Sequence, residues 1–225
     1  MILKENYLAI RKELSDKNVQ LITVSKTKPV DDLRELFLLG QKAFGENYVQ
    51  ELVEKQPQLS SEIEWHFIGH LQSNKVKMIA PFVHTIHAVD SFSLLLEIEK
   101  QAAKCNRTIN CLLQIHIADE ATKFGLTENE LLEILEKIKS MPLKHAVIDG
   151  LMGMATFTED ESKIENEFRL LKLLFEKVKN DFLKSEKSFQ QISMGMSSDY
   201  KIAVAQGSTM VRIGSLIFGE RNYQQ

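Results

Sequence analysis

The sequence has little cysteine, proline or glycine and no long hydrophobic run. Its 225 residues include two cysteines, Cys105 and Cys111, whose spacing matches neither a metal site nor a C-x-x-C redox motif, so we expect free thiols in a reducing compartment. Four prolines and ten glycines exclude collagen-like and linker-rich chains. No apolar run approaches the roughly 18 residues of a membrane span. The charged, amphipathic N-terminus is unlike a signal peptide, and we expect a cytoplasmic protein.

The composition is that of an ordinary globular chain. Hydrophobic residues make up 44% and charged residues 26%, which excludes bulk disorder. The net charge is −3 and no dense basic cluster occurs, so we expect no nucleic-acid partner. The histidines His66, His70, His84 and His87 are too scattered to predict a metal site.

Short apolar runs alternate with longer stretches of helical spacing along the whole chain. Near-continuous apolar runs of this length are typical of strands that are covered on both faces, as in a parallel sheet. The predicted strands are Leu21–Lys26, Lys42–Glu46, Trp65–Gly69, Thr85–Asp90, Cys111–Ile117, Ala146–Gly150, Gln191–Gly195 and Met210–Gly214.

Several helix starts can be recognised between these runs. An amphipathic helix before the first strand is indicated by Leu3, Tyr7, Ile10 and Leu14. Pro29 stands where a helix can begin. Thr127 followed by Glu130 is a capping box, and Thr158 followed by Glu161 predicts a second one. The apolar spacing after Thr158 continues to Phe182 and predicts the longest helix.

These elements favour a single (β/α)8 barrel over residues 1–225, with an extra N-terminal helix. An open doubly wound sheet is the alternative, but it usually needs fewer strands and often has a glycine-rich first turn. No G-x-G-x-x-G occurs in the sequence. No shift in composition indicates a linker, so we expect one domain.

A lysine ends the first predicted strand. A barrel has its active site at the carboxyl ends of the strands, so the Lys26 ammonium should lie near the barrel mouth, partly desolvated. Desolvation lowers the pKa of a lysine and yields the neutral amine that attacks a carbonyl. A surface lysine at a strand end is the simpler alternative. Lys28 lies on the same face and competes for the role, although its place beside Pro29 should leave it more exposed.

The last two predicted strands end in small and hydroxyl residues, in the segments 193–199 and 207–215. The loops after strands seven and eight are the usual phosphate site of a barrel, because backbone amides can approach phosphate oxygens there. Ser197 or Ser198 could instead be the N-cap of a helix over Asp199–Gln206.

Two other polar positions point to the barrel mouth. Arg212 stands inside an apolar strand, where a guanidinium must find an acceptor because it cannot lose its charge. The second strand ends in Gly45 followed by polar side chains that include Asn47.

Taken together, these segments resemble the pyridoxal phosphate homeostasis proteins, single-domain barrels related to alanine racemase. The matching stretches are VSKTKP, FGENYVQE, WHFIGHLQSNK, GLMGMATFTED, SMGMSSD and GSTMVRIGSLIFGER. They span nearly the whole chain in the expected order, so the resemblance is far more specific than any single motif.

The resemblance implies a fold-type-III barrel that holds pyridoxal 5′-phosphate as a Schiff base on the lysine of VSKTKP. It places an arginine near the pyridine nitrogen and phosphate contacts in SMGMSSD and RIGS. The residues that we expect to contact the cofactor are Lys26, Asn47, Met194, Ser197, Arg212, Gly214 and Ser215. We expect no catalytic and no metal-ligating residue.

The function implied by the resemblance is non-enzymatic binding of pyridoxal phosphate, which buffers the cofactor or delivers it to apo-enzymes. An arginine at the ring nitrogen donates to an unprotonated nitrogen and weakens the electron sink. Racemases of this type add a second domain, for which a chain ending at Gln225 leaves no room. We expect a monomer without robust catalysis. A weak racemase-type enzyme, or an aldolase-type barrel in which Lys26 attacks a sugar phosphate, are the alternatives.

Overall fold

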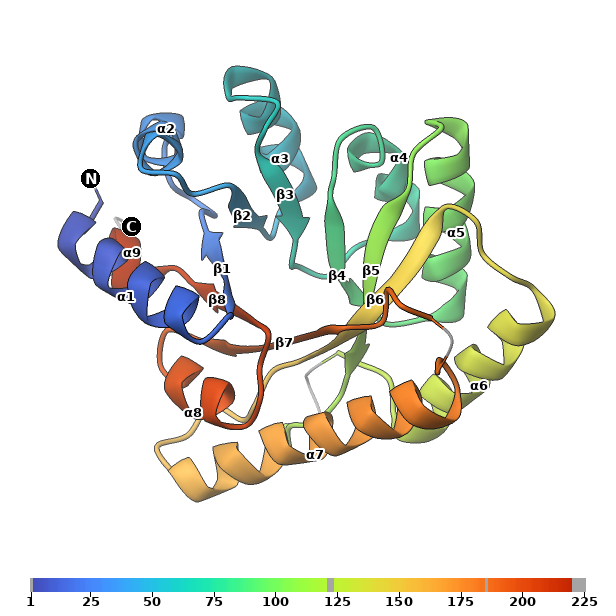
Figure 1. Ribbon diagram of the computed structural model, residues 1–225. Helices are drawn as coiled ribbons and strands as arrows, with labels where there is room; N and C mark the ends of the chain where they lie inside the picture. The colour runs from blue at the N-terminus through green and yellow to red at the C-terminus, as the bar shows by residue number, and fades with distance from the viewer. Residues whose placement is uncertain (1, 121–123, 185, 220–225) are drawn as a thin grey trace.

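The computed structural model describes residues 2–120, 124–184 and 186–219, which contain a closed barrel of eight parallel strands (Figure 1). Each strand pairs with the next one in sequence, and β8 closes the barrel on β1. The strands are β1 Gln20–Val24, β2 Ala43–Glu46, β3 Glu64–Phe67, β4 Thr85–Val89, β5 Ile109–Ile115, β6 Ala146–Gly153, β7 Gln191–Met196 and β8 Met210–Ile213. The structure confirms the (β/α)8 barrel, and each predicted strand overlaps an observed one.

Helices surround the barrel. They are α1 Lys4–Asp16, α2 Val30–Leu38, α3 Val49–Lys55, α4 Val76–Ile79, α5 Phe92–Lys104, α6 Glu128–Ser140, α7 Glu161–Asp181, α8 Tyr200–Ala205 and α9 Ser215–Phe218, with short 3-10 turns at Gln56–Gln58 and Ser73–Lys75. α1 is the expected extra helix before β1. It lies beside α9 (Figure 1), and the Leu3 amide donates to the Ile217 carbonyl at 2.7 Å, so the two ends of the described chain are joined.

The start of α6 confirms the first predicted capping box. The Thr127 hydroxyl accepts from the Glu130 amide at 3.3 Å, and the Glu130 carboxylate accepts from the Thr127 amide at 2.8 Å. Both groups satisfy backbone donors that have no partner within the helix, which stabilises the helix start.

The second predicted capping box is wrong, because α7 begins after Asp160. The Asp160 carboxylate accepts from the Lys163 amide at 3.1 Å, whereas the Thr158 hydroxyl accepts from the Asp160 amide at 3.1 Å. The preceding segment is held outside the helix by the Thr156 amide, which donates to the Glu167 carboxylate at 2.6 Å. Thr158 and Asp160 can both cap a helix, and the contact between Thr156 and Glu167 favours a start at Asp160.

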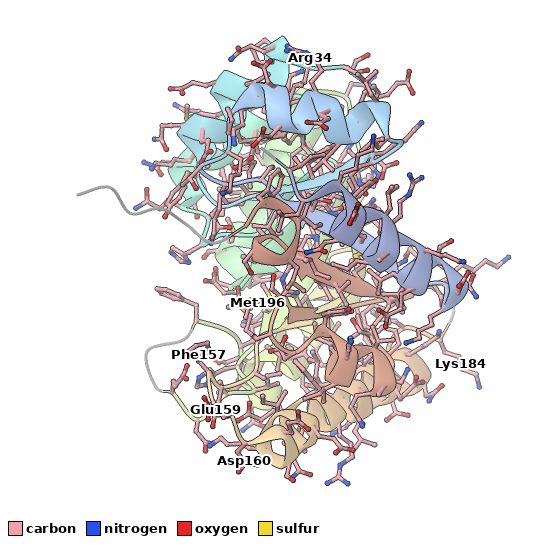
Figure 2. All side chains as sticks on the ribbon, turned by 90° about the vertical axis from the view of Figure 1, so that its left-hand side faces the viewer. Arg34, Phe157, Glu159, Asp160, Lys184 and Met196 are labelled. Atoms are coloured by element: carbon pink, nitrogen blue, oxygen red, sulfur yellow. The ribbon has the colours of Figure 1, made fainter. Side chains whose placement is uncertain are left out.

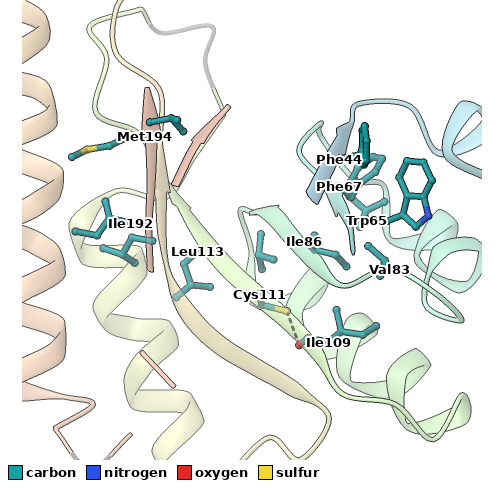
Figure 3. Close-up of a cluster of buried hydrophobic side chains, with 14 of the residues drawn as sticks. Phe44, Trp65, Phe67, Val83, Ile86, Ile109, Cys111, Leu113, Ile192 and Met194 are labelled. Carbon is teal, nitrogen blue, oxygen red and sulfur yellow. Dashed lines mark hydrogen bonds between the residues drawn. The ribbon is translucent and has the colours of Figure 1, made fainter. Parts of the chain in front are cut away.

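The hydrophobic core has an outer layer between barrel and helices and a smaller cluster inside the barrel. Figure 3 shows part of the outer layer, where Phe44 and Trp65 lie near each other with ring centroids 6.2 Å apart. The cluster inside the barrel comprises Ile22, Ala43, Ala88, Leu112, Met152 and Met210. Strand alternation sends Phe44 outward and its neighbour Ala43 inward. Since most of the interior is apolar, the polar groups in it stand out.

Both cysteines are free thiols, as expected. Cys111 is fully buried in the outer layer, and burial raises the pKa of its thiol far above the usual range. A thiol that does not ionise is a poor nucleophile and a poor metal ligand. Among residues 2–120, 124–184 and 186–219, no group of three or more His, Cys, Asp or Glu side chains is arranged to hold a metal ion. Within these ranges, no helix has an apolar stretch of the length that crossing a bilayer requires.

Asp149, on β6, should lower the stability of the folded chain at neutral pH. Burial raises the pKa of its carboxyl to about 6, so folding disfavours the ionised form. Stability associated with this group is present below the unfolded pKa and is lost as the pH rises through about 6. We expect Asp149→Asn to raise the free energy of unfolding by about 1 kcal/mol at about pH 8, after allowance for solvent screening of a half-buried group. At about pH 4 the unmodified protein and Asp149→Asn should unfold at the same urea concentration. An equal gain at both pH values would contradict this account.

Candidate functional site

A cavity of about 560 Å³ lies at the carboxyl ends of the strands. Its lining residues come from the ends of β1, β2, β3, β6, β7 and β8 and from the loops that follow them, so segments distant in sequence meet there. They are Val24, Lys26, Lys28, Asn47, Ile68, Met154, Phe157, Met196, Ser197, Ser198, Arg212, Gly214, Ser215, Leu216 and Gly219. All the predicted cofactor contacts except Met194 belong to this set.

The position of Met194 differs from the one that the sequence analysis predicts, which is beside the cofactor. Its side chain is fully buried in the outer core layer, beside Ile192 in Figure 3, and it does not line the cavity. Successive side chains of a strand point to opposite faces, so Ser193 faces the barrel interior and Met194 faces the helices. The methionine of this strand that does line the cavity is Met196.

The rim of the cavity carries an exposed aromatic side chain. Phe157, in the loop after β6, is 87% exposed and also lines the cavity. In Figure 2 the labels of Phe157 and Met196 both lie on the half of the molecule away from Lys184. The cavity therefore opens at the end of the barrel where Phe157 projects.

Lys26 and Lys28 both reach the cavity. Lys26 lies in the turn that follows β1, and both side chains are half-buried, so exposure does not distinguish them. The Lys28 ammonium lies 5.7 Å from the centroid of the Phe218 ring, a cation–π distance that draws it toward α9.

A buried cluster of charged side chains holds this turn in place. The Lys55 ammonium donates to the Ser25 carbonyl at 2.8 Å, to the Glu46 carboxylate at 2.8 Å and to the Glu51 carboxylate at 2.6 Å. Glu51 also accepts from the Thr27 amide at 2.6 Å, and Thr27 has a φ of 63°, in the left-handed region. We call Ser25, Glu46, Glu51 and Lys55 the turn cluster.

The turn cluster escaped the sequence analysis. Glu46 is fully buried, and desolvation raises the pKa of its carboxyl although the neighbouring Lys55 ammonium acts to lower it. A helix lysine and a strand glutamate nine positions apart carry no recognisable spacing, so only the packing of α3 against β2 brings them together.

The ends of β7 and β8 meet at the predicted phosphate position. The Gly214 amide donates to the Ser197 hydroxyl at 3.3 Å, and Ser215 begins α9. A Cβ atom on Gly214 would lie 3.1 Å from the Val24 carbonyl oxygen, so a side chain there would crowd β1. The possible N-cap role of Ser197 and Ser198 is excluded, because Asp199 takes the position before α8.

Arg212 is a buried cation at the cavity. Its side chain is 4% exposed, with Nη1 donating to the Ser193 hydroxyl at 2.6 Å and Nη2 to the Gly153 carbonyl at 3.2 Å. Burial lowers the pKa of the guanidinium to about 10, and Asp199 acts in the opposite direction. Arg212 therefore stays charged at neutral pH, held by neutral acceptors.

The cavity suits an anionic ligand. Among the residues that the structure describes, its lining carries three cationic side chains and no carboxylate. The Oδ1 atom of Asn47 is buried and has no hydrogen-bond partner in the described part of the chain, an unfavourable arrangement that a ligand group can satisfy. Neighbouring amides and hydroxyls of Ser197, Gly214 and Ser215 add neutral donors for phosphate oxygens. These features fit pyridoxal phosphate, which brings a phosphate, a phenolic oxygen and a ring nitrogen.

Comparison with known proteins agrees with this geometry. The family model for the alanine racemase N-terminal domain matches residues 2–222. The pyridoxal phosphate homeostasis protein of Pasteurella multocida is 40% identical over 210 residues, which cover 92% of this chain and 88% of that protein. The pyridoxal phosphate homeostasis protein of Haemophilus influenzae is 39% identical over 219 residues, 96% of this chain and 91% of the relative.

Solved structures show the same fold. PipY of Synechococcus elongatus with PLP bound is 32% identical, has a TM-score of 0.87 and is covered to 99%, against 96% of this chain. An alanine racemase from Clostridium difficile is 14% identical with a TM-score of 0.74, and the similarity spans 99% of this chain but 57% of the racemase. That likeness concerns the fold alone.

Proposed function

Because the chain belongs to the family of pyridoxal phosphate homeostasis proteins, within the wider alanine racemase N-terminal domain family, we propose that it holds pyridoxal 5′-phosphate in the barrel-mouth cavity. The observation that carries the proposal is the cavity lining, whose described residues combine three cations with hydroxyl and amide donors and include no carboxylate. The cofactor brings a doubly ionisable phosphate and a phenolate, which would neutralise these cations.

Five residues of the cavity have a role in this proposal. Lys26 would supply the amine that bonds to the aldehyde carbon of the cofactor, with release of one water molecule. Ser197, Gly214 and Ser215 hold the phosphate, and Arg212 donates to the ring nitrogen. Bound pyridoxal phosphate supplies a conjugated ring that can accept electrons from a carbon next to the Schiff base.

The same lining argues for holding the cofactor rather than using it. A strong electron sink needs an acidic partner that keeps the ring nitrogen protonated, and Arg212 can only donate. The titratable residues among the described lining are Lys26, Lys28 and Arg212, so this part of the cavity has no histidine, tyrosine or carboxylate to move a proton. We therefore propose buffering or delivery of the cofactor. Delivery to apo-enzymes, a monomeric state and a cytoplasmic location stay predictions.

One observation favours a second candidate, a weak racemase-type enzyme. Lys28 puts a second amine into the cavity, and a second amine could exchange a proton with a substrate. Incubation of the cofactor-loaded protein with L-alanine, followed by chiral chromatography for D-alanine, separates the two. Turnover of about 1 per second or more would overturn the non-enzymatic proposal. An aldolase-type barrel would instead be trapped by borohydride only after a sugar phosphate is added.

A phosphate site predicts that the protein binds pyridoxal phosphate much more tightly than pyridoxal, which lacks the phosphate. Pyridoxal phosphate should bind on the order of 100-fold more tightly than pyridoxal, since two charge-assisted hydrogen bonds contribute about 1.5 kcal/mol each. Absorbance titration of the cofactor-free protein measures both affinities. In Ser197→Ala the affinity for the phosphate ester should fall while that for pyridoxal stays the same. Equal affinities of the unmodified protein for the two forms would refute the phosphate site.

A further inference from the structure

A chain of hydrogen bonds runs from the cavity into the barrel interior. Arg212 donates to Ser193 at 2.6 Å, the Ser193 hydroxyl contacts His87 Nδ1 at 3.0 Å, and His87 Nε2 contacts His66 Nδ1 at 2.8 Å. All four side chains are buried, and they come from β8, β7, β4 and β3. The chain ends at His66 Nε2, which is buried and has no partner among the described residues.

Both histidines of this chain are neutral. Burial lowers the pKa of His66 to about 3, with the nearby His84 acting in the same direction. Burial also lowers the pKa of His87 well below its usual value, and His66 and Arg212 lower it further. A neutral imidazole has one donor nitrogen and one acceptor nitrogen, so the chain can run in two directions.

The Arg212 charge favours one direction. A guanidinium only donates, so the Ser193 oxygen accepts from it. If the Ser193 hydroxyl donates to His87 Nδ1, then His87 Nε2–H donates to His66 Nδ1, and only the His66 Nε2–H is left over. In the reverse direction the Ser193 hydrogen loses its acceptor among the described contacts, and its dipole no longer points away from the cation. The first direction satisfies more buried groups and aligns every dipole with the charge.

We infer that Ser193, His87 and His66 are positioning residues for Arg212, which they hold at the cavity through a hydrogen-bond chain of a single direction. A serine oxygen that donates onward is a better acceptor, so the chain strengthens the bond that fixes the guanidinium. The Ser193 hydroxyl and the Gly153 carbonyl accept from two N–H groups of the Arg212 guanidinium, and its other N–H groups are left for a ligand. The orientation of a ring nitrogen by Arg212 rests on the proposed function, whereas the direction of the chain does not.

The direction can be tested on the cofactor-free protein. Long-range proton–nitrogen NMR correlations report which ring nitrogen of each histidine carries the hydrogen. We expect His66 and His87 each to be protonated at Nε2 alone. Arg212→Met should produce mixed tautomers at both residues, although its hydrogen bonds to described residues go to Ser193 and Gly153 and not to the histidines. Mixed tautomers in the unmodified protein, or unchanged tautomers in Arg212→Met, would overturn the inference.

The positioning role has a separate readout with pyridoxal phosphate as the probe. Ser193→Ala removes one of the two acceptors of Arg212 and should weaken binding about tenfold, the equivalent of about 1.4 kcal/mol, while Ser193→Thr should restore it. His87→Leu should weaken binding less than Ser193→Ala does and shift the absorbance maximum of the bound cofactor. The matched control is His84→Gln, because the His84 ring lies 5.5 Å from that of His66 but bonds to Thr85 outside the chain.

The two readouts separate failure of this inference from failure of the proposed function. If the tautomers behave as expected but the unmodified protein does not bind pyridoxal phosphate, the proposed function is wrong, whereas the inferred direction of the hydrogen-bond chain is confirmed. If the cofactor binds and Ser193→Ala changes its affinity by less than about twofold, the positioning role is wrong.

Discussion

Replacing Lys26 by alanine should abolish the covalent hold on pyridoxal phosphate. The purified protein is expected to be yellow, and borohydride should remove that absorbance by reducing the Schiff base to a stable amine. In Lys26→Ala, borohydride should leave no cofactor covalently attached to the chain, since the amine that we assign to the Schiff base is gone. Mass spectrometry of the reduced protein should locate the cofactor on the peptide that contains Lys26.

Lys28→Ala is the matched control, because this lysine lines the same cavity and is equally half-buried. It should keep the yellow band and lose part of the affinity, since one of the three cations of the lining is gone. If Lys28→Ala loses the band and Lys26→Ala keeps it, the assignment of the two lysines has to be exchanged. The two variants therefore decide a question that strand periodicity leaves open.

Of the substitutions proposed in this chain, we expect Lys55→Met to lower the free energy of unfolding most. It removes the cation from the turn cluster and leaves the fully buried Glu46 carboxylate without its ion partner. Removal of one partner from a buried ion pair costs about 3–5 kcal/mol. The Ser25 carbonyl and the Glu51 carboxylate lose a donor as well. Urea denaturation followed by circular dichroism should show this loss as a lower midpoint.

Two variants control the Lys55 experiment. Lys42→Met removes an exposed lysine that pairs with Glu62, and it should cost less than about 1 kcal/mol. Adding Glu46→Gln to Lys55→Met should recover part of the lost stability, because the buried charge is removed together with its partner. A loss that the second substitution does not reduce would show that Lys55 acts through packing alone.

The turn cluster also connects stability to the site. It fixes the backbone of Ser25 and Thr27, the residues on either side of Lys26. A turn with Thr27 in the left-handed region is unfavourable for a residue with a β-branched side chain, so it persists where neighbouring contacts hold it. Loss of the cluster should therefore weaken cofactor binding as well as the fold.

The barrel itself could be read from the sequence because its determinants are local. Each strand is a short apolar run, and a strand covered on both faces needs such a run wherever it lies in the chain. The capping box at Thr127 is also local, since both of its hydrogen bonds join residues three positions apart. The box at Thr158 failed because a contact with Glu167, outside the local segment, moved the helix start to Asp160.

The residues expected to contact the cofactor were predicted from motifs, and the structure brings all of them except Met194 to one cavity. A matching motif identifies the segment that contributes to the site. Which side chains of that segment face the barrel interior depends on the register of the strand in the closed barrel. In β7 that register turns Ser193 inward and Met194 outward, which a matched string of letters does not show. The same limit applies to Lys26 and Lys28, which share a face.

The amino-acid sequence alone determined the fold, the family and the chemical character of the barrel mouth, because these depend on residue types that recur at readable spacings. Only the tertiary structure decided which polar groups meet inside the barrel. His66, His87 and Ser193 lie on three different strands and share no motif, yet the closed barrel joins them in one chain of hydrogen bonds that ends at Arg212. Such contacts join residues up to 106 positions apart, a separation at which no local preference acts, so they depend on the way the strands close.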